Sequence, residues 1–232
     1  MIDLNDLVPS EMARLLGKPE GESGRAVANM LNRINAGITA AVYERLQLKP
    51  GERVLEVGFG NGKLLPNLLS RADHLTYEGV DIAETMVADA NAFNADLVAA
   101  GRAAFRLASA ETLPFPDQTF DKVFAVNVIY FWPRPLRALS EIRRVLRPDG
   151  LSCIASAVSV PGEPPPAFAR PEFGFYRRDL EAILALHREA GFDHVEVDDH
   201  YRESITLPDR ADRKRNYVIV LAQPKIPSQS SA

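Results

Sequence analysis

Residues 54–65 of this chain read VLEVGFGNGKLL, and this stretch decides the expected fold. Three glycines, Gly58, Gly60 and Gly62, stand between the apolar run of residues 53–57 and a helical pattern over residues 63–71. Glycine lets the backbone turn sharply and lets a ligand approach it closely. The order of apolar run, glycine turn and helical pattern is typical of a strand, a ligand-binding turn and a crossover helix.

Three classes of ligand-binding turn contain such glycines, and the neighbouring residues discriminate among them. A phosphate-binding Walker loop needs four residues between its first glycine and a Gly-Lys pair, followed by Ser or Thr. Here only three residues separate Gly58 from Gly62, and Leu64 follows Lys63, so this class is excluded. A dinucleotide-binding turn needs its third glycine where Lys63 stands, which weakens that class. The pattern that remains is ExGxGxG, from Glu56 to Gly62.

Short apolar runs and helical patterns alternate along the chain on both sides of this turn. Such an alternation is typical of a parallel α/β sheet with crossover helices. We expect strands at residues 53–57, 75–80, 103–107, 122–126 and 151–158, and helices at residues 63–71, 83–100 and 135–146. The central part of the chain is therefore expected to form one α/β domain.

The N-terminal part of the chain carries a separate helical pattern. Apolar residues recur at helical spacing over residues 27–48, and Lys49-Pro50-Gly51 then stops the helix. An amphipathic stripe of this kind needs a partner surface. We therefore interpret residues 1–50 as an N-terminal helical cap or lid over a ligand-binding domain at residues 51–223.

The C-terminal part is expected to close the sheet. Proline-rich residues 161–166 predict a surface loop, which could act as a lid. A helix over residues 177–190 follows, and then two strands over residues 194–201 and 216–221, joined by a charged turn at 208–215, which should pair antiparallel. Residues 224–232 are polar and interrupted by prolines, and we interpret them as a frayed tail.

Two further stretches narrow the ligand class. Asp81 ends the expected second strand, where a carboxylate can accept hydrogen bonds from the ribose hydroxyls of a nucleoside ligand, or can cap the following helix. Residues 109–121 read SAETLPFPDQTFD. Together with the ExGxGxG turn, this segment resembles the class I S-adenosylmethionine-dependent methyltransferases, in particular the ubiquinone and menaquinone C-methyltransferase-like (type 11) group. The resemblance covers about residues 54–157.

The resemblance implies a fold, a cofactor and a set of site residues. The fold would be a Rossmann-like, doubly wound α/β sheet of seven strands in the order 3-2-1-4-5-7-6, with strand 7 antiparallel and an N-terminal helical extension. The cofactor would be S-adenosyl-L-methionine, with S-adenosyl-L-homocysteine as product. Cofactor-binding residues implied by the matching motifs are Glu56, Gly58, Phe59, Gly60, Gly62, Asp81, Ile82, Ser109, Ala110, Glu111 and Asn127.

The acceptor side of the site is expected after the fourth strand, where residues 127–133 read NVIYFWP. The position matches the [DN]PPY motif of base amino-methyltransferases, but both prolines of that motif are missing. Tyr130 and Trp132 are candidates for an acceptor wall, or for a core plug. Methyl transfer needs chiefly alignment and exclusion of water. For a catalytic group we name Tyr130 and, as a base at the end of the penultimate strand, His200.

The composition and net charge of the chain limit the classes of function that it could have. The 232 residues carry a formal net charge of -4, which offers no general attraction to nucleic acid or to anionic membranes. No stretch reaches the roughly 20 apolar residues of a membrane span, and Cys153, the one cysteine, excludes an internal disulfide and a thiolate metal cluster. We expect a cytoplasmic enzyme without a metal, a monomer or homodimer, that methylates the oxygen, nitrogen or carbon of a small-molecule acceptor. The alternatives are a noncatalytic S-adenosylmethionine-binding module and a nicotinamide-dependent oxidoreductase.

Overall fold

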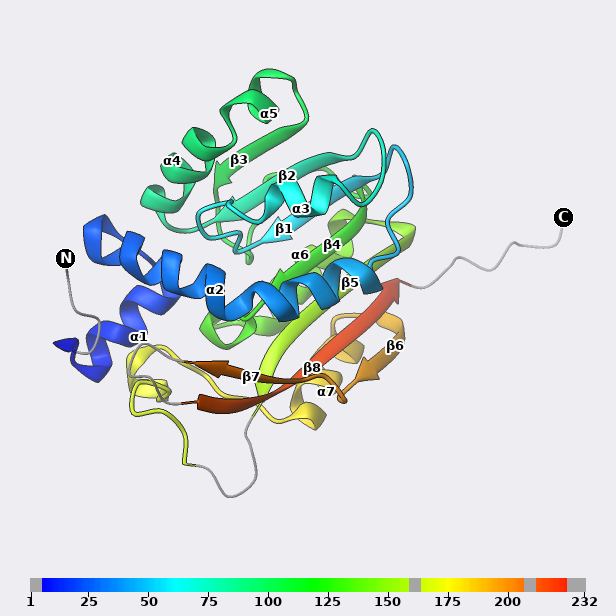
Figure 1. The fold of residues 1–232 in the computed structure, drawn as a ribbon. Coiled ribbons are helices and arrows are strands. Elements are labelled where there is room, and N and C mark those ends of the chain that lie inside the picture. The colour runs from blue at the N-terminus through cyan, green and yellow to red at the C-terminus, as the bar shows by residue number, and fades with distance from the viewer. Residues whose placement is uncertain (1–5, 159–163, 207–211, 225–232) are drawn as a thin grey trace, which may run out of the picture.

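The computed structural model describes residues 6–158, 164–206 and 212–224. Its strands form one mixed sheet in the order β3-β2-β1-β4-β5-β8-β6, and β7 pairs with β8 (Figure 1). Strands β1 to β5 run parallel, whereas β8 is antiparallel to β5 and β6. The expected order is confirmed, with β8 as the antiparallel strand 7. The strands are β1 Arg53–Val57, β2 Thr76–Asp81, β3 Ala103–Leu107, β4 Phe120–Val126, β5 Leu146–Val158, β6 Phe192–Asp198, β7 Arg202–Thr206 and β8 Asp212–Pro224.

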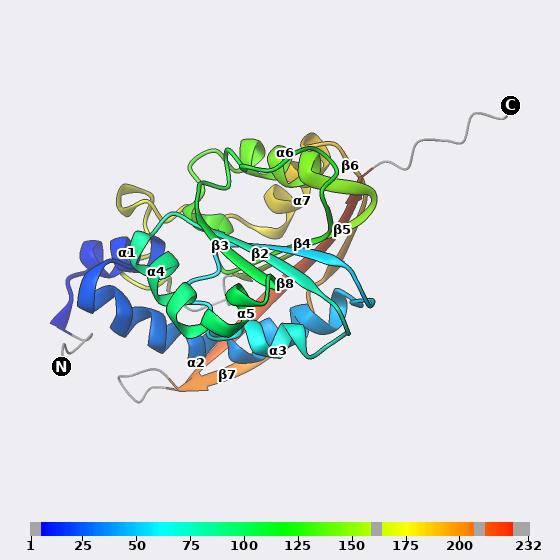
Figure 2. The ribbon, with the colours of Figure 1, turned by 90° about the horizontal axis from the view of Figure 1, so that it is seen from above.

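Helices cover both faces of the sheet. Figure 2 shows α6 and α7 on one face and α2, α3, α4 and α5 on the other. The described helices are α1 Pro9–Gly17, α2 Gly21–Arg45, α3 Leu65–Leu69, α4 Glu84–Phe93, α5 Ala95–Ala99, α6 Pro135–Val145 and α7 Leu180–Glu189, with short 3-10 turns η2 Ile129–Phe131 and η3 Pro171–Phe173. None of them is long and apolar enough to cross a membrane.

Each face of the sheet has its own hydrophobic core, because parallel strands flanked by crossover helices bury side chains in both directions. On one face, α2 packs Ile38 and Val42, both fully buried, into a cluster with residues of β1, β2 and β4. The other face holds a second cluster, which includes Leu139 and Ile142 of α6. The C-terminal half of α2 therefore belongs to the main core and is more than a cap.

The N-terminal half of α2 forms a smaller cluster with α1. Leu15 of α1 packs with Val27, Met30 and Ile34 of α2, and all four are buried. The two helices are separated by Pro19 and by a break before Gly21. Helix α2 begins at Gly21, six residues before the first apolar residue of the predicted stripe, and its first turns include the exposed charged residues Glu22 and Arg25.

Several element boundaries differ from the sequence expectations. The helix expected over residues 83–100 is interrupted at Asn94, whose side-chain amide donates to the carbonyls of Gly62 at 3.1 Å and Ala90 at 2.9 Å. The helix expected from residue 177 begins at Leu180, because the Asp179 carboxylate caps it by accepting the Ala182 N–H at 2.8 Å.

The strands also depart from the expectations at their ends. Strand β5 begins at residue 146 rather than 151, with a register shift against β4. The expected strand over residues 194–201 stops at residue 198, and the additional strand β7 pairs with the first residues of β8, inside the expected charged turn. Residues 208–211 of that turn, residues 161–163 of the proline-rich loop and residues 225–232 of the tail lie outside the described residues.

Candidate active site at the carboxyl ends of the parallel strands

A cavity of about 900 Å³ opens at the carboxyl ends of the central strands. Segments far apart in the sequence line it: the glycine turn, the end of β2, residues 108–111 and residues 126–133 on the sheet side, and α1, α2 and residues 164–169 and 175–178 opposite. Figure 1 shows α1 and the start of α2 on the side to which β1 to β4 point. This is the edge where open α/β sheets bind ligands.

The glycine turn has a backbone that only glycine adopts without strain. Gly58 has φ +80°, and a Cβ there would lie 2.6 Å from Cγ1 of Val128. Gly62 has φ +70°, and its Cβ would lie 2.8 Å from Cβ of Ala90 on α4. Gly58 and Gly60 line the cavity, whereas Gly62 does not: it lets the turn pack against α4. The close helix contact is thus made by Gly62, and position 63 is free to carry a lysine.

Asp81 lies at the tip of β2, where the sequence places it, and is only 8% exposed. One carboxylate oxygen accepts the Gly60 N–H at 3.0 Å and the other accepts the Ala83 N–H at 2.9 Å. Each oxygen retains a further lone pair. Burial raises the pKa of Asp81 from 3.8 to about 6, against the opposing effect of the backbone hydrogen bonds. The side chain thus accepts the N–H of the residue that precedes α4, and it also faces the cavity.

Glu56 on β1 is a second acidic group facing the cavity. Its carboxylate accepts a hydrogen bond from the hydroxyl of Tyr77 at 2.7 Å. Burial raises the pKa of Glu56 from 4.5 to about 7, with a smaller contribution from the nearby charge of Asp81. Among the described residues no basic side chain pairs with Glu56. A buried carboxylate without a cation is poised to bind one.

Residues 109–111 form the far wall beside β2, and their side chains have different tasks. Ser109 Oγ accepts the Glu111 N–H at 3.2 Å, and its own O–H remains able to donate. The Glu111 carboxylate accepts the backbone N–H of Arg134 at 3.0 Å and its Nε–H at 2.8 Å, so it binds the start of α6. Ala110 and the 46% exposed side chain of Ile82 add apolar surface to the cavity.

The amides of α2 connect the N-terminal helices to the turn and to β4. Asn127 has φ +58°; its side-chain oxygen accepts the Ala157 N–H at 3.0 Å, and its amide donates to Asn35 at 3.0 Å. Asn32 likewise donates to Asn61 of the glycine turn at 3.0 Å. Asn127 lines the cavity, and both the oxygen and the nitrogen of its side-chain amide already form hydrogen bonds within the protein. Sequence reasoning missed the role of Asn61, although it stands inside the motif.

Aromatic side chains form the opposite half of the cavity. The ring of Tyr130 stacks on Phe175 with centroids 4.3 Å apart, and Phe131 meets Phe175 edge to face at 5.0 Å. Trp132 is buried beside them, and Tyr176 donates its N–H to the Tyr130 carbonyl at 2.7 Å. Tyr130 and Trp132, the candidates for an acceptor wall or a core plug, both line the cavity and also pack with the core cluster of α6. Phe175 of the segment that follows the proline-rich loop completes this aromatic group.

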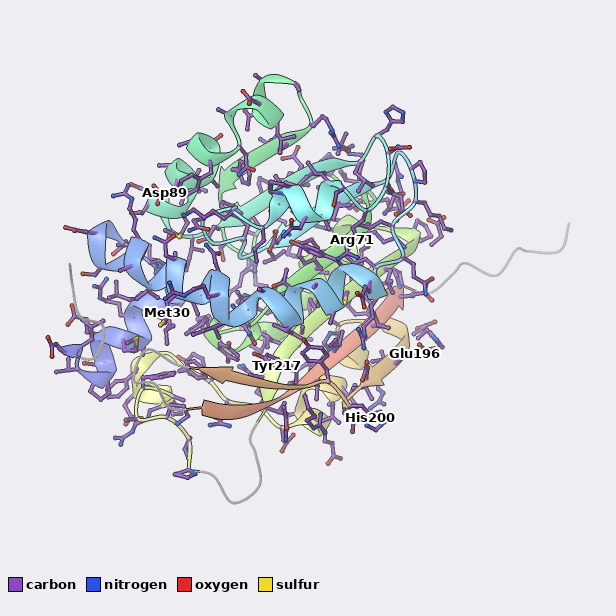
Figure 3. All side chains as sticks on the ribbon, in the orientation of Figure 1. Met30, Arg71, Asp89, Glu196, His200 and Tyr217 are labelled. Atoms are coloured by element: carbon purple, nitrogen blue, oxygen red, sulfur yellow. The ribbon has the colours of Figure 1, made fainter. Side chains whose placement is uncertain are left out.

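The structure does not bring the proposed base to this site. His200 follows β6, its side chain is 92% exposed, and it lies beside Asp199. In Figure 3 it stands near β6 and β7, well separated from Met30, which lines the cavity. Among the described residues, no histidine lines the cavity and no group of three or more His, Cys, Asp or Glu side chains could hold a metal ion.

The chain is similar in sequence to known methyltransferases. A family model described as "Methyltransferase domain" matches residues 55–154. The chain is 29% identical over 183 residues to 27-O-demethylrifamycin SV methyltransferase of Amycolatopsis mediterranei, covering 78% of this chain and 63% of that protein. It is 30% identical over 167 residues to an O-methyltransferase of Aspergillus nomiae, covering 70% of this chain and 73% of the relative.

A solved structure extends the likeness to the whole fold. Phosphoethanolamine N-methyltransferase 2 of Haemonchus contortus, in complex with S-adenosyl-L-methionine, superposes with a TM-score of 0.72 at 17% identity, covering 97% of this chain and 61% of that one. The chain spans about three fifths of the length of the first curated relatives that it matches. The glycine turn, the acidic residues at the strand ends and these matches are the evidence for the family. The chain belongs to the class I S-adenosylmethionine-dependent methyltransferases, in the type 11 group.

Proposed function

We propose that this protein transfers the methyl group of S-adenosylmethionine to a hydroxyl oxygen of a small, mainly apolar acceptor. The observation that carries the proposal is one continuous cavity of about 900 Å³, which joins the carboxylates at the strand ends to an aromatic chamber. Ligand pockets typically measure about 300–1,000 Å³. The size therefore suits a cofactor with an acceptor beside it.

The cofactor half fits S-adenosylmethionine, which supplies a methyl group already activated on a sulfonium. Glu56, a buried carboxylate without a basic partner among the described residues, would hold the ammonium of the methionine part. Asp81 would accept hydrogen bonds from the ribose hydroxyls with the lone pairs that Gly60 and Ala83 leave free. Ile82 and Ala110 would flank the adenine, and Ser109 would offer its hydroxyl to the ring edge.

Oxygen is the acceptor atom that the other half supports best. Apolar and aromatic side chains dominate its described lining, and the charged residues among them are the arginines 177 and 178. A cationic amine would meet no carboxylate of the described residues there, so an ammonium-bearing acceptor is disfavoured. Two of the curated relatives compared above are named as methylating oxygen, one of them at a hydroxyl of a rifamycin.

Catalysis would rest mainly on positioning. Displacement at carbon forms one carbon–oxygen bond as one carbon–sulfur bond breaks, S-adenosylhomocysteine leaves, and the proton of the methylated oxygen is released to bulk solvent when the cavity opens. Tyr130, held by its stack on Phe175, would fix the plane of an acceptor ring. The α1–α2 cap, tied down by the Asn35–Asn127 and Asn32–Asn61 hydrogen bonds, would exclude water from the reacting atoms.

Two measurements test the proposal. Calorimetric titration with S-adenosylmethionine, S-adenosylhomocysteine and NADH should give binding of both adenosyl ligands and none of NADH. Asp81→Asn should weaken that binding at least tenfold, whereas Asp96→Asn, a control at an exposed site on α5 outside the cavity, should not. Absence of adenosyl binding would refute the proposal, and NADH binding would revive the oxidoreductase alternative.

The acceptor is then sought with methyl-labelled cofactor and a panel of phenols, macrolide and ansamycin alcohols and amines. We expect label in an oxygen-linked methyl group, identified by mass spectrometry, and in none of the amines. Tight cofactor binding without transfer to any member would favour a noncatalytic binding module. Label in amines would overturn the assignment of oxygen.

A further inference from the structure

Charge is divided along the cavity. Among the described residues that line it, the acidic side chains are Glu56, Asp81 and Glu111, and all belong to the cofactor half. The basic ones are Arg177 and Arg178, which precede α7 and border the aromatic half. The described carboxylates of the cavity therefore lie in the cofactor half, and none of them forms a described ion pair with Arg178.

Arg178 has a defined set of donors still unused. Its Nη1 donates to the carbonyls of Ile129 at 3.2 Å and Tyr176 at 3.0 Å, and its Nη2 donates to that of Trp132 at 3.4 Å. An arginine has five N–H donors. Among the described residues, the Nε–H and one Nη2–H have no acceptor, and the atoms Nε and Nη2 share one edge of the guanidinium. Elsewhere in this protein, Arg106 uses its Nε and Nη2 donors to bind the carboxylate of Glu78 side-on.

The surroundings of Arg178 leave its charge uncompensated. The side chain is half-buried, and its described partners are backbone carbonyls and the face of Tyr176, with the guanidinium carbon 5.8 Å from the ring centroid. Burial lowers the pKa of Arg178, which reports the cost of holding this cation away from water. A carboxylate bound to its open edge would offset that cost through two charge-assisted hydrogen bonds.

We propose that Arg178 is a specificity-determining residue that binds a carboxylate of the acceptor side-on, through its Nε and Nη2 donors. The acceptor is then an apolar or aromatic hydroxy acid whose acidic end lies at Arg178 and whose body packs against Tyr130 and Phe175. The inference rests on the proposed function, since it assigns the acceptor half of that cavity. It predicts that the free acid is preferred over its neutral ester.

The test uses Trp132 as an internal reporter. It is the one tryptophan of the chain, it is buried at the cavity, and its carbonyl contacts Arg178. The protein saturated with S-adenosylhomocysteine is titrated with benzoate, 4-hydroxycinnamate, 1-hydroxy-2-naphthoate and dodecanoate, and with the methyl ester of each, following tryptophan fluorescence and heat. We expect at least one acid to bind tenfold or more tightly than its ester.

Variants assign that preference to one side chain. Arg178→Gln should reduce the ratio of acid to ester affinity to near one, and Arg178→Lys should retain only part of it, because an ammonium lacks the planar edge. Arg188→Gln removes the same charge from the exposed face of α7, outside the cavity, and should leave the ratio unchanged. Unchanged binding of S-adenosylhomocysteine shows that the Arg178 variants keep the cavity intact.

The failures of the two proposals are distinguishable. If S-adenosylhomocysteine does not bind, the proposed function fails and this inference fails with it. If it binds but acid and ester bind equally, or no acid binds, or the preference survives in Arg178→Gln, then the role of Arg178 is refuted and the methyltransferase assignment stands.

Discussion

Replacing Glu56 with glutamine should make the protein more stable at neutral pH and make it bind its cofactor less tightly. The pKa of this carboxyl is raised from 4.5 to about 7, so ionising it inside the fold costs about 3 kcal/mol more than in the unfolded chain, at about 1.36 kcal/mol per pKa unit. Glutamine carries no charge, and its amide oxygen can still accept the hydrogen bond from Tyr77.

The sign of the effect follows from proton linkage. The folded protein holds the Glu56 proton more tightly than the unfolded chain does, so the free energy of unfolding of the wild type falls as pH rises from 4.5 to about 7. The glutamine variant does not lose stability in this way, because its side chain does not ionise. Its advantage should be small at pH 5 and should grow to about 3 kcal/mol at pH 8, before any discount for relaxation of the site.

Urea unfolding of the ligand-free protein at pH 5 and pH 8 measures the stability change, and calorimetry measures cofactor binding. At pH 8 the variant should bind S-adenosylmethionine at least tenfold less tightly, a loss of about 1.4 kcal/mol. Glu44→Gln, at an exposed site on α2, is the charge-matched control and should change neither quantity. The reasoning about Glu56 is refuted if the variant is less stable than the wild type at pH 8. It is also refuted if the difference in free energy of unfolding between variant and wild type is the same at pH 5 and at pH 8.

Three further predictions test the turn, the cap and the second carboxylate. Gly58→Ala should lower the free energy of unfolding by about 1–3 kcal/mol more than Gly51→Ala, because both have positive φ but only the first meets a neighbouring atom; equal losses in urea would contradict this. Alanine variants of Asn35 and Asn127 should couple by about 0.5–3 kcal/mol in a double-mutant cycle, and additive effects would deny the link between α2 and β4. Because the pKa of Asp81 is about 6, binding of S-adenosylmethionine at pH 6 should release protons, and the affinity should rise as the pH rises from 5 to 7. Calorimetry in two buffers of different ionisation enthalpy should show that Asp81→Asn releases fewer protons. An unchanged proton release would exclude this carboxyl as a source.

Much of the cofactor half could be predicted from the sequence because its determinants are local. The glycines of the turn need positive φ or a close approach, and that need is written in the residue type itself. Asp81 is the last residue of its strand, so its place at the sheet edge follows from the position of the strand. The alternation of apolar runs and helical patterns predicted the parallel sheet for the same reason.

Element ends and single side chains were harder, because contacts between distant residues decide them. Asn94 interrupts the expected helix because its amide binds the carbonyl of Gly62, 32 residues away. Glu111 was named as a cofactor-binding residue by resemblance; it lines the cavity, and the structure adds that its carboxylate binds Arg134 at the start of α6. No pattern in the sequence predicts the partner of Asn94 or of Glu111.

The acceptor half depended on tertiary structure throughout. Arg178 resembles any surface arginine in the sequence, and only the packing of its segment against the residues after β4 brings it to the cavity. His200 had the right position along the chain, but the end of β6 leaves it in solvent. By itself, the sequence determined the family, the sheet and the cofactor turn, since these follow from local stereochemistry and hydrophobic period. The tertiary structure alone decided which side chains meet around the acceptor, because that cavity is assembled from α1, α2 and loops far apart in the chain.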